Sequence, residues 1–142
     1  MKTILVPIDI AEEAAGTAAL RLGRDLAKMR GGKLVLLNVL EQVPGYVVAQ
    51  LPEGFHESAL LAAAARLKEI AREQELGETA EIVVREGHPP TVILELASEI
   101  GADMIVVASH SPGLVDYFLG SVAARVVRHA DCSVLVTRNL AS

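Results

Sequence analysis

Residues 104–130 read Met104-Ile-Val-Val-Ala-Ser-His-Ser-Pro-Gly-Leu-Val-Asp-Tyr-Phe-Leu-Gly-Ser-Val-Ala-Ala-Arg-Val-Val-Arg-His-Ala130. The apolar, mostly β-branched run from Met104 to Val107 predicts a strand that is buried on both faces. Ser121 to Ala130 predicts a helix, because Val122, Val126 and His129 recur at helical spacing. The loop between them is rich in small and polar residues, which are Ser109, His110, Ser111, Pro112 and Gly113.

This strand–loop–helix unit has two interpretations. Such a loop offers backbone N–H groups to phosphate, and the helix start adds free donors with partial positive charge. However, any connection between a strand and a helix needs small residues and a capping group, and Ser121 supplies one. From these residues alone the second interpretation is the simpler one.

Strand and helix patterns alternate along the rest of the chain. The predicted strands are Lys2–Asp9, Lys33–Leu40, Glu81–Arg85, Met104–Val107 and Val134–Thr137. The predicted helices are Ala14–Met29, Ser58–Glu73, a helix between Gly87-His-Pro-Pro and Gly101, and Ser121–Ala130. The order predicts an α/β fold: a doubly wound open sheet of five parallel strands with helices on both faces. No linker or repeat divides residues 1–142, so we expect one domain.

Two details of packing follow from the same patterns. Ala15, Ala18, Leu22, Leu26 and Met29 share one face of the first helix, which predicts its buried side. The irregular stretch Glu41–Glu57 is long for a compact domain and carries Tyr46 and Phe55. These two aromatic side chains either cover a site or anchor the stretch to the core, and anchoring is the commoner role.

Composition excludes several classes of function. Hydrophobic residues make up 51% of the 142 residues, yet no run is long enough to span a membrane. The single cysteine, Cys132, allows no internal disulfide and favours a cytoplasmic location. A net charge of −5 and an aromatic content of 3% argue against nucleic acid as a partner. We therefore expect a cytoplasmic protein that binds neither membrane nor nucleic acid.

The whole chain resembles the universal stress protein family. The resemblance lies in Ile4-Leu-Val-Pro-Ile-Asp9, Asn38-Val39-Leu40, Gly87-His-Pro, Gly101-Ala-Asp-Met-Ile-Val-Val and, most specifically, Leu119-Gly-Ser-Val-Ala-Ala-Arg-Val-Val-Arg-His-Ala-Asp-Cys-Ser-Val-Leu-Val. It implies the adenine-nucleotide α-hydrolase-like fold. It also implies a homodimer formed through the final strand, with a tetramer as the other assembly left open.

Many members of this family bind ATP through a glycine, two residues, a second glycine, nine residues, and then glycine with serine or threonine. In this chain Ala108 and Ser111 stand at the two glycine positions, and only eight residues separate Ser111 from Gly120-Ser121. Two glycines are thus replaced and the loop is one residue short. The Ser111-Pro112 pair looks like a variant found in one branch of the family that retains the terminal Gly-Ser and includes nucleotide binders.

The resemblance implies an ATP site, with a Mg²⁺ ion bridging the phosphates as an optional component. By this resemblance, adenine and ribose would contact Pro7, Asp9 and Val39. The ribose and phosphates would be lined by Ala108, Ser109, His110 and Ser111. The β- and γ-phosphates would be held by Gly120, Ser121 and Val122. From the residues alone, Asp9 is equally suited to cap the helix that follows it. Ala108 is tolerable only if its φ is negative.

Three functions remain open on the sequence. The first is an ATP-binding regulatory or stress-response homodimer. The second is a homodimeric scaffold that binds no nucleotide, which the replaced glycines favour. The third is an enzyme limited to slow ATP hydrolysis, in which Asp9 and His110 would polarise water; the chain lacks a Gly-x-x-x-x-Gly-Lys-Ser/Thr loop, so this ranks last.

Overall fold

The computed structural model describes residues 2–42, 44–76, 79–109 and 119–138. Strands and helices alternate along the described residues as the sequence predicts, and a short 3₁₀ helix (η1) and a short α-helix (α2) add to the predicted elements. The elements are β1 (Thr3–Pro7), η1 (Ile10–Glu12), α1 (Glu13–Arg30), β2 (Lys33–Leu40), α2 (Gly45–Val48), α3 (Phe55–Glu73), β3 (Ala80–Glu86), α4 (Pro89–Ile100), β4 (Met104–Ala108), α5 (Ser121–His129) and β5 (Ser133–Thr137).

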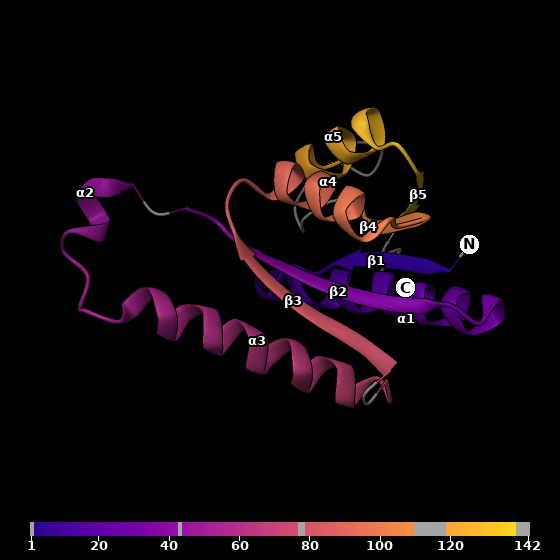
Figure 1. Cartoon of the computed structure of the whole chain (residues 1–142), viewed down its shortest axis with the longest axis horizontal. Coiled ribbons are helices and arrows are strands. Elements are labelled where there is room, and N and C mark those ends of the chain that lie inside the picture. The colour runs from indigo at the N-terminus through magenta and orange to yellow at the C-terminus, as the bar shows by residue number, and fades with distance from the viewer. Residues whose placement is uncertain (1, 43, 77–78, 110–118, 139–142) are drawn as a thin grey trace.

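The five strands form one parallel sheet in the order β3-β2-β1-β4-β5. Helices α1 and α3 cover one face of the sheet, and α4 and α5 cover the other (Figure 1). The predicted doubly wound α/β fold is therefore confirmed. The chain proceeds from β1 outward to β2 and β3, then returns to the other side of β1 for β4 and β5.

Neighbouring residues of the central strands face opposite layers. In β1, Ile4 and Val6 contact the layer of α1 and α3, whereas Leu5 contacts the layer of α4 and α5. Strand β4 repeats this arrangement with Val106 on the first side and Ile105 on the second. Both faces of the central strands are buried against helices, which explains why these strands are almost continuously apolar in sequence.

Helix ends lie where the sequence signals place them. Gly31 follows α1 with φ +62°, and Gly101 ends α4 with φ +63°, a left-handed conformation that glycine adopts at little cost. Pro89 and Pro90 occupy the first turn of α4, where a missing N–H costs no helical hydrogen bond. Among the described residues, no helix is both long and apolar enough to cross a membrane.

The predicted buried side of α1 is correct in part. Leu22 and Leu26 are partly buried and pack against the core, whereas Met29 is 73% exposed and the side chain of Ala15 lies outside the described part of the structure. The fully buried positions of the helix are Gly16, Ala19, Leu20, Gly23 and Ala27. The reason is the close approach of α1 to β1. A Cβ atom built on Gly23 would lie 2.6 Å from Val6 Cγ2, and one on Gly16 would lie 2.8 Å from Ile8 Cγ2.

The stretch between β2 and α3 leaves the body of the protein, and α2 lies apart from the sheet (Figure 1). Tyr46 is 76% exposed and Phe55 is 45% exposed. The expectation that these aromatic side chains anchor the stretch to the core is therefore wrong. Neither of them lines the clefts described below.

We predict that Gly23→Leu destabilises the fold by about 1–3 kcal/mol, because the added side chain overlaps Val6 beneath the helix. Urea unfolding followed by circular dichroism measures the change. Lys28→Leu adds the same side chain at an exposed position of α1 and should change the stability by less than about 0.5 kcal/mol. Equal losses in the two variants would contradict the proposed close approach.

Candidate functional site

The main cleft of the protein opens where β1, β2 and β4 end, in a volume of about 580 Å³. Because the chain leaves β1 and β4 toward opposite edges of the sheet, the connections that follow these two strands separate there. A crevice at such a reversal is where open α/β sheets hold ligands. The volume also lies within the range of about 300–1,000 Å³ that is usual for small-molecule sites.

Most of the residues selected from the sequence line this main cleft. They are Pro7, Asp9, Val39, Ala108, Ser109, Gly120, Ser121 and Val122. His110 and Ser111 lie outside the described residues. The structure thus brings together residues from the ends of three strands and the start of α5, while their role toward a ligand stays a prediction.

The end of β4 and the start of α5 are joined directly. Gly120 N–H donates to the Ser109 carbonyl over 2.5 Å, and Ser109 N–H donates to the carbonyl of Thr137 in β5 over 2.8 Å. These bonds fix Ser109, which is 2% exposed, at the floor of the cleft. They also place the first turn of α5 at its wall.

Among the described residues, no side chain caps the start of α5. Gly120 is the N-cap residue with φ −63° and ψ 159°, and it makes no side-chain capping bond. The first turn of α5 contains no acidic residue. Gly120, Ser121, Val122 and Ala123 line the cleft, and within the described part of the chain no carboxylate or hydroxyl caps this helix end, whose partial positive charge favours an anion.

Ala108 has the negative φ that a residue other than glycine requires at this position. It is the last residue of β4, and among the described residues only Glu75 has a positive φ outside glycine. The methyl group thus stands at a position where the backbone is extended. Replacement of the expected glycine costs no backbone strain here.

Asp9 fulfils the capping role and also lines the cleft. Its Oδ1 accepts a hydrogen bond from Ala11 N–H over 2.9 Å, which closes a turn at the start of η1. The side chain as a whole is exposed. One carboxylate oxygen is engaged in this turn, and Asp9 stands at the rim where a ligand would enter.

Asn38 is the polar residue that sequence reasoning undervalued. It is 3% exposed and lines the main cleft between β1 and β2. Its Nδ2 donates to the Ile8 carbonyl over 2.8 Å, while Ile8 N–H donates to the Leu37 carbonyl over 2.7 Å. Asn38 Oδ1 has no hydrogen-bond partner among the described residues. The amide therefore ties the segment that carries Asp9 to the end of β2.

Other residues of the cleft were not predicted. They include Ile8, Glu41, Pro89 and Ile93. Glu41 directly follows β2, so its position at a strand end was a usable signal. Pro89 and Ile93 come from α4, which lies on the opposite face of the sheet from α1. Their sequence pattern indicates only a buried helix face.

The described residues contain no cluster of three or more His, Cys, Asp or Glu side chains that could hold a metal ion. Burial raises the pKa of the Cys132 thiol above its ordinary value, which disfavours a reactive thiolate. The main cleft is lined by the start of α5, by apolar side chains and by the carboxylates of Asp9 and Glu41. This arrangement suits binding.

The family model and the related sequences described next belong to one protein family. The model of the universal stress protein family matches residues 1–138. Universal stress protein G of Salmonella typhimurium is 31% identical over 144 residues, which cover 96% of this chain and 99% of that protein. Universal stress protein Sll1654 of Synechocystis is 34% identical over 141 residues, with 95% and 84% covered.

Solved structures share the fold. Hypothetical protein MJ0577 superposes with a TM-score of 0.81 at 24% identity, over 99% of this chain and 98% of that one. A universal stress protein in complex with cAMP gives a TM-score of 0.70 at 20% identity, over 96% of each chain. The universal stress protein from Archaeoglobus fulgidus in complex with dAMP gives 0.64 at 22%, over 96% and 97%.

We predict that Asn38→Leu lowers the free energy of unfolding by about 1–3 kcal/mol, since it leaves the buried Ile8 carbonyl without its donor. Gln74→Leu removes the acceptor of an exposed bond from Arg21 and should cost less than about 0.5 kcal/mol. Chemical denaturation of both variants gives the comparison. An unchanged or higher stability of Asn38→Leu would mean that the unpaired Oδ1 outweighs the bond to Ile8.

Proposed function

Since this chain belongs to the universal stress protein family, we propose that it is a homodimeric regulatory protein of the stress response that binds ATP in its main cleft. The observation that carries the proposal is the meeting of the uncapped start of α5 with the ends of β1, β2 and β4 around this cleft. The main cleft thereby offers hydrogen-bond donors for phosphate beside apolar side chains for a base.

The two ends of the cleft differ in chemistry. Ile8, Val39, Ile93 and Val107 supply apolar surface near the strand ends, which suits a purine ring. Gly120, Ser121 and Val122 supply backbone N–H groups at the helix start, which suits phosphate. We therefore place adenine and ribose near Pro7, Asp9 and Val39, and the phosphates along Ala108, Ser109 and the first turn of α5. His110 and Ser111, which precede this turn in sequence, complete the proposed site.

Relatives of the same fold support an adenine nucleotide as the ligand, because one is known with cAMP and another with dAMP. We propose ATP as the physiological ligand of this chain. The described residues offer no three-residue acidic or histidine cluster for a metal, so any Mg²⁺ would be held through the phosphates. Triphosphate binding would then couple the conformation of the α5 region to the level of ATP.

The edge of the sheet supports the homodimer. Strand β5 lies at one end of the strand order and pairs on one side with β4. Because the Thr137 carbonyl faces β4, the alternating geometry of a strand turns the Val136 N–H toward the open side. Pairing of two β5 strands across a twofold axis would satisfy these edge groups. A tetramer would contain the same β5 pairing within each of its two dimers.

We predict that ATP raises the melting temperature of the wild-type protein, corresponding to about 2.7 kcal/mol at a concentration 100 times Kd. Gly120→Glu should abolish the shift, because its carboxylate faces the phosphate position, and φ −63° at Gly120 accommodates any residue. Gly45→Glu adds the same charge at an exposed site in α2 and should keep the shift. Differential scanning fluorimetry measures all three proteins. No shift of the wild-type protein with ATP, cAMP or dAMP would favour the scaffold without nucleotide instead.

We predict that the wild-type protein sediments at twice the 15.0 kDa mass of one chain. Val136→Pro should sediment as the monomer, because it removes an N–H that faces the open edge and leaves the β4 ladder intact. Analytical ultracentrifugation gives the masses, and the far-ultraviolet circular dichroism spectrum checks that the variant is folded. A folded Val136→Pro dimer would exclude β5 pairing.

A further inference from the structure

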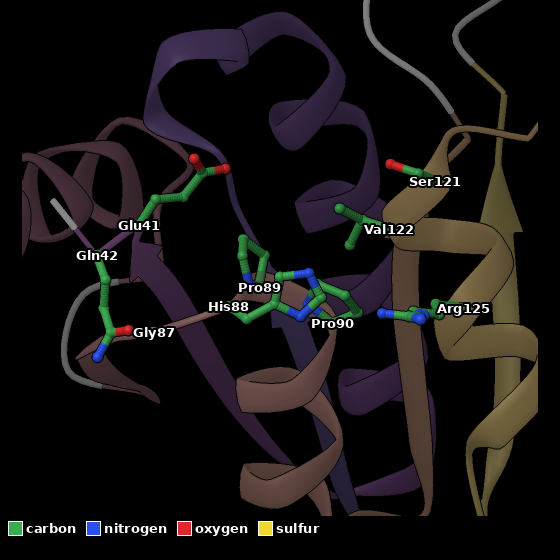
Figure 2. A pocket seen from close by; sticks show the side chains of 9 residues that line it. All are labelled: Glu41, Gln42, Gly87, His88, Pro89, Pro90, Ser121, Val122 and Arg125. Atoms are coloured by element: carbon green, nitrogen blue, oxygen red, sulfur yellow. The ribbon is translucent and has the colours of Figure 1, made fainter. Parts of the chain in front are cut away.

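A second cleft adjoins the main cleft on the side away from β1. This side cleft has a volume of about 620 Å³ and lies between the end of β2, the start of α4 and the first turns of α5 (Figure 2). Glu41, Pro89, Ser121 and Val122 line both clefts. The two clefts therefore adjoin, and Ser121 and Val122 at the start of α5 stand at their boundary.

Two basic side chains face the side cleft from different elements. Arg125 comes from the second turn of α5, and its guanidinium points away from its own helix toward His88 and Pro90 (Figure 2). His88 is the N-cap residue of α4, and its Nδ1 lies 3.1 Å from Thr91 Oγ1. That contact orients the ring and leaves Nε2 unengaged by it.

Arg125 takes part in none of the ion pairs formed among the described residues. Its neighbour Arg128 on the same helix is exposed as well, but Arg128 lines neither cleft. A guanidinium that faces a cleft without an ion-pair partner among the described residues, next to the positive end of α5, repels cations and attracts anions. The position of Arg125, and not merely its charge, is what distinguishes it from Arg128.

The opposite wall of the side cleft has different chemistry. Glu41 and Gln42 lie there, at the end of β2, across the cleft from Arg125 (Figure 2). A carboxylate on this wall repels an anion. An anionic ligand is therefore favoured beside Arg125, His88 and Ser121, and of these three residues Ser121 also lines the main cleft.

We propose that the side cleft receives the terminal phosphates of a nucleotide whose base lies in the main cleft, so that Arg125 and His88 select nucleotides by the length of their phosphate chain. The inference rests on the proposed function and deepens it. A monophosphate ends at the first turn of α5 and does not reach these residues. The β- and γ-phosphates of a triphosphate pass Ser121 and accept hydrogen bonds from the guanidinium and the imidazole.

The test is isothermal titration of AMP and ATP into the full-length wild-type protein, Arg125→Gln and Arg128→Gln, at fixed ionic strength with EDTA. We expect Arg125→Gln to weaken ATP binding by roughly five- to tenfold, the effect of losing one partly exposed contact between arginine and phosphate. AMP binding should change by less than about twofold, and Arg128→Gln should leave both affinities unchanged.

The possible failures are distinguishable. If Arg125→Gln weakens AMP and ATP equally, or if Arg128→Gln matches its effect on ATP, selection by phosphate length at the side cleft is overturned while nucleotide binding stands. If the wild-type protein binds neither nucleotide, the proposed function is overturned and this inference with it.

Two further variants probe the opposite walls. His88→Gln should weaken ATP binding without weakening AMP binding, because it removes the second group that faces the terminal phosphates. Glu41→Gln should have the opposite sign and strengthen ATP binding relative to AMP, because it removes the facing carboxylate. A weaker binding of ATP by Glu41→Gln in EDTA would contradict the proposed path of the phosphate chain.

Discussion

The reversal of strand order at β1 is the constraint on which the site depends. Strands β1 and β4 are hydrogen-bonded neighbours, yet the chain leaves them toward opposite edges of the sheet. Among the described residues, the main cleft lies at the carboxyl ends of these two strands. Asp9 follows β1, Ser109 follows β4, and the bond from Gly120 N–H to the Ser109 carbonyl adds the start of α5 to the same cleft.

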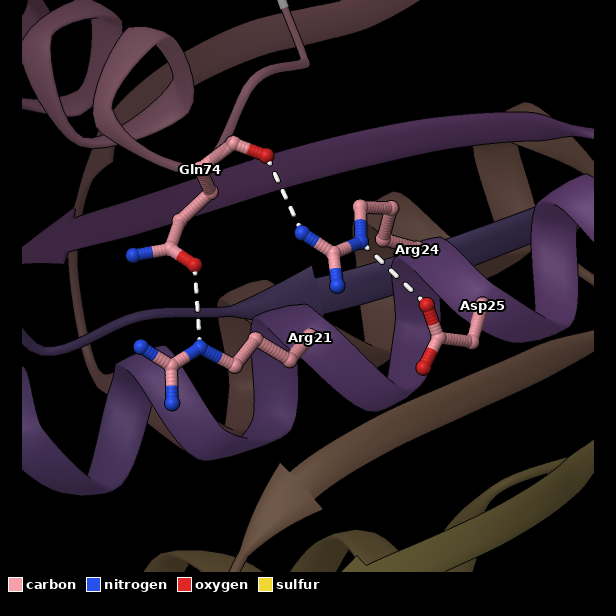
Figure 3. A network of polar contacts seen from close by, with 4 residues as sticks. All are labelled: Arg21, Arg24, Asp25 and Gln74. Atoms are coloured by element: carbon pink, nitrogen blue, oxygen red, sulfur yellow. Dashed lines mark hydrogen bonds and ion pairs between the residues drawn. The ribbon is translucent and has the colours of Figure 1, made fainter.

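Sequence patterns identified the elements of the fold because each central strand is buried on both faces and each helix ends at a local signal. They located only part of the buried face of α1, since a count of apolar residues gives no weight to Gly16 and Gly23, where the helix closely approaches Ile8 and Val6. Polar contacts add to this placement: Arg24 Nη1 donates to the Gln74 carbonyl over 3.1 Å and Arg21 Nε donates to Gln74 Oε1 over 3.0 Å (Figure 3). Partners so distant in sequence leave no local pattern.

The candidate site likewise contains some residues that the sequence could locate and others that it could not. Pro7, Asp9, Val39 and Ser109 were predictable because the end of a parallel strand is a position that sequence can locate. His88 and Arg125 were visible as residues, but nothing local shows that α4 and α5 turn them toward one cleft. The exposed Tyr46 shows the converse error, because an aromatic side chain in a long connection resembles an anchor until the path of that connection is known.

Asn38 shows how the fold accepts a local cost at the site. A buried amide oxygen without a partner among the described residues is unfavourable, and an apolar residue at this position would avoid it. The same amide, however, supplies the donor to the Ile8 carbonyl, one residue before Asp9. Parallel pairing between β1 and β2 ends at Pro7 and Leu37, so beyond that point the ladder no longer holds the two segments together. The Asn38 side chain and the bond from Ile8 N–H to the Leu37 carbonyl hold them instead, and they keep the rim of the main cleft in place. Departures from apolar packing at such a position are expected where structure is maintained for binding.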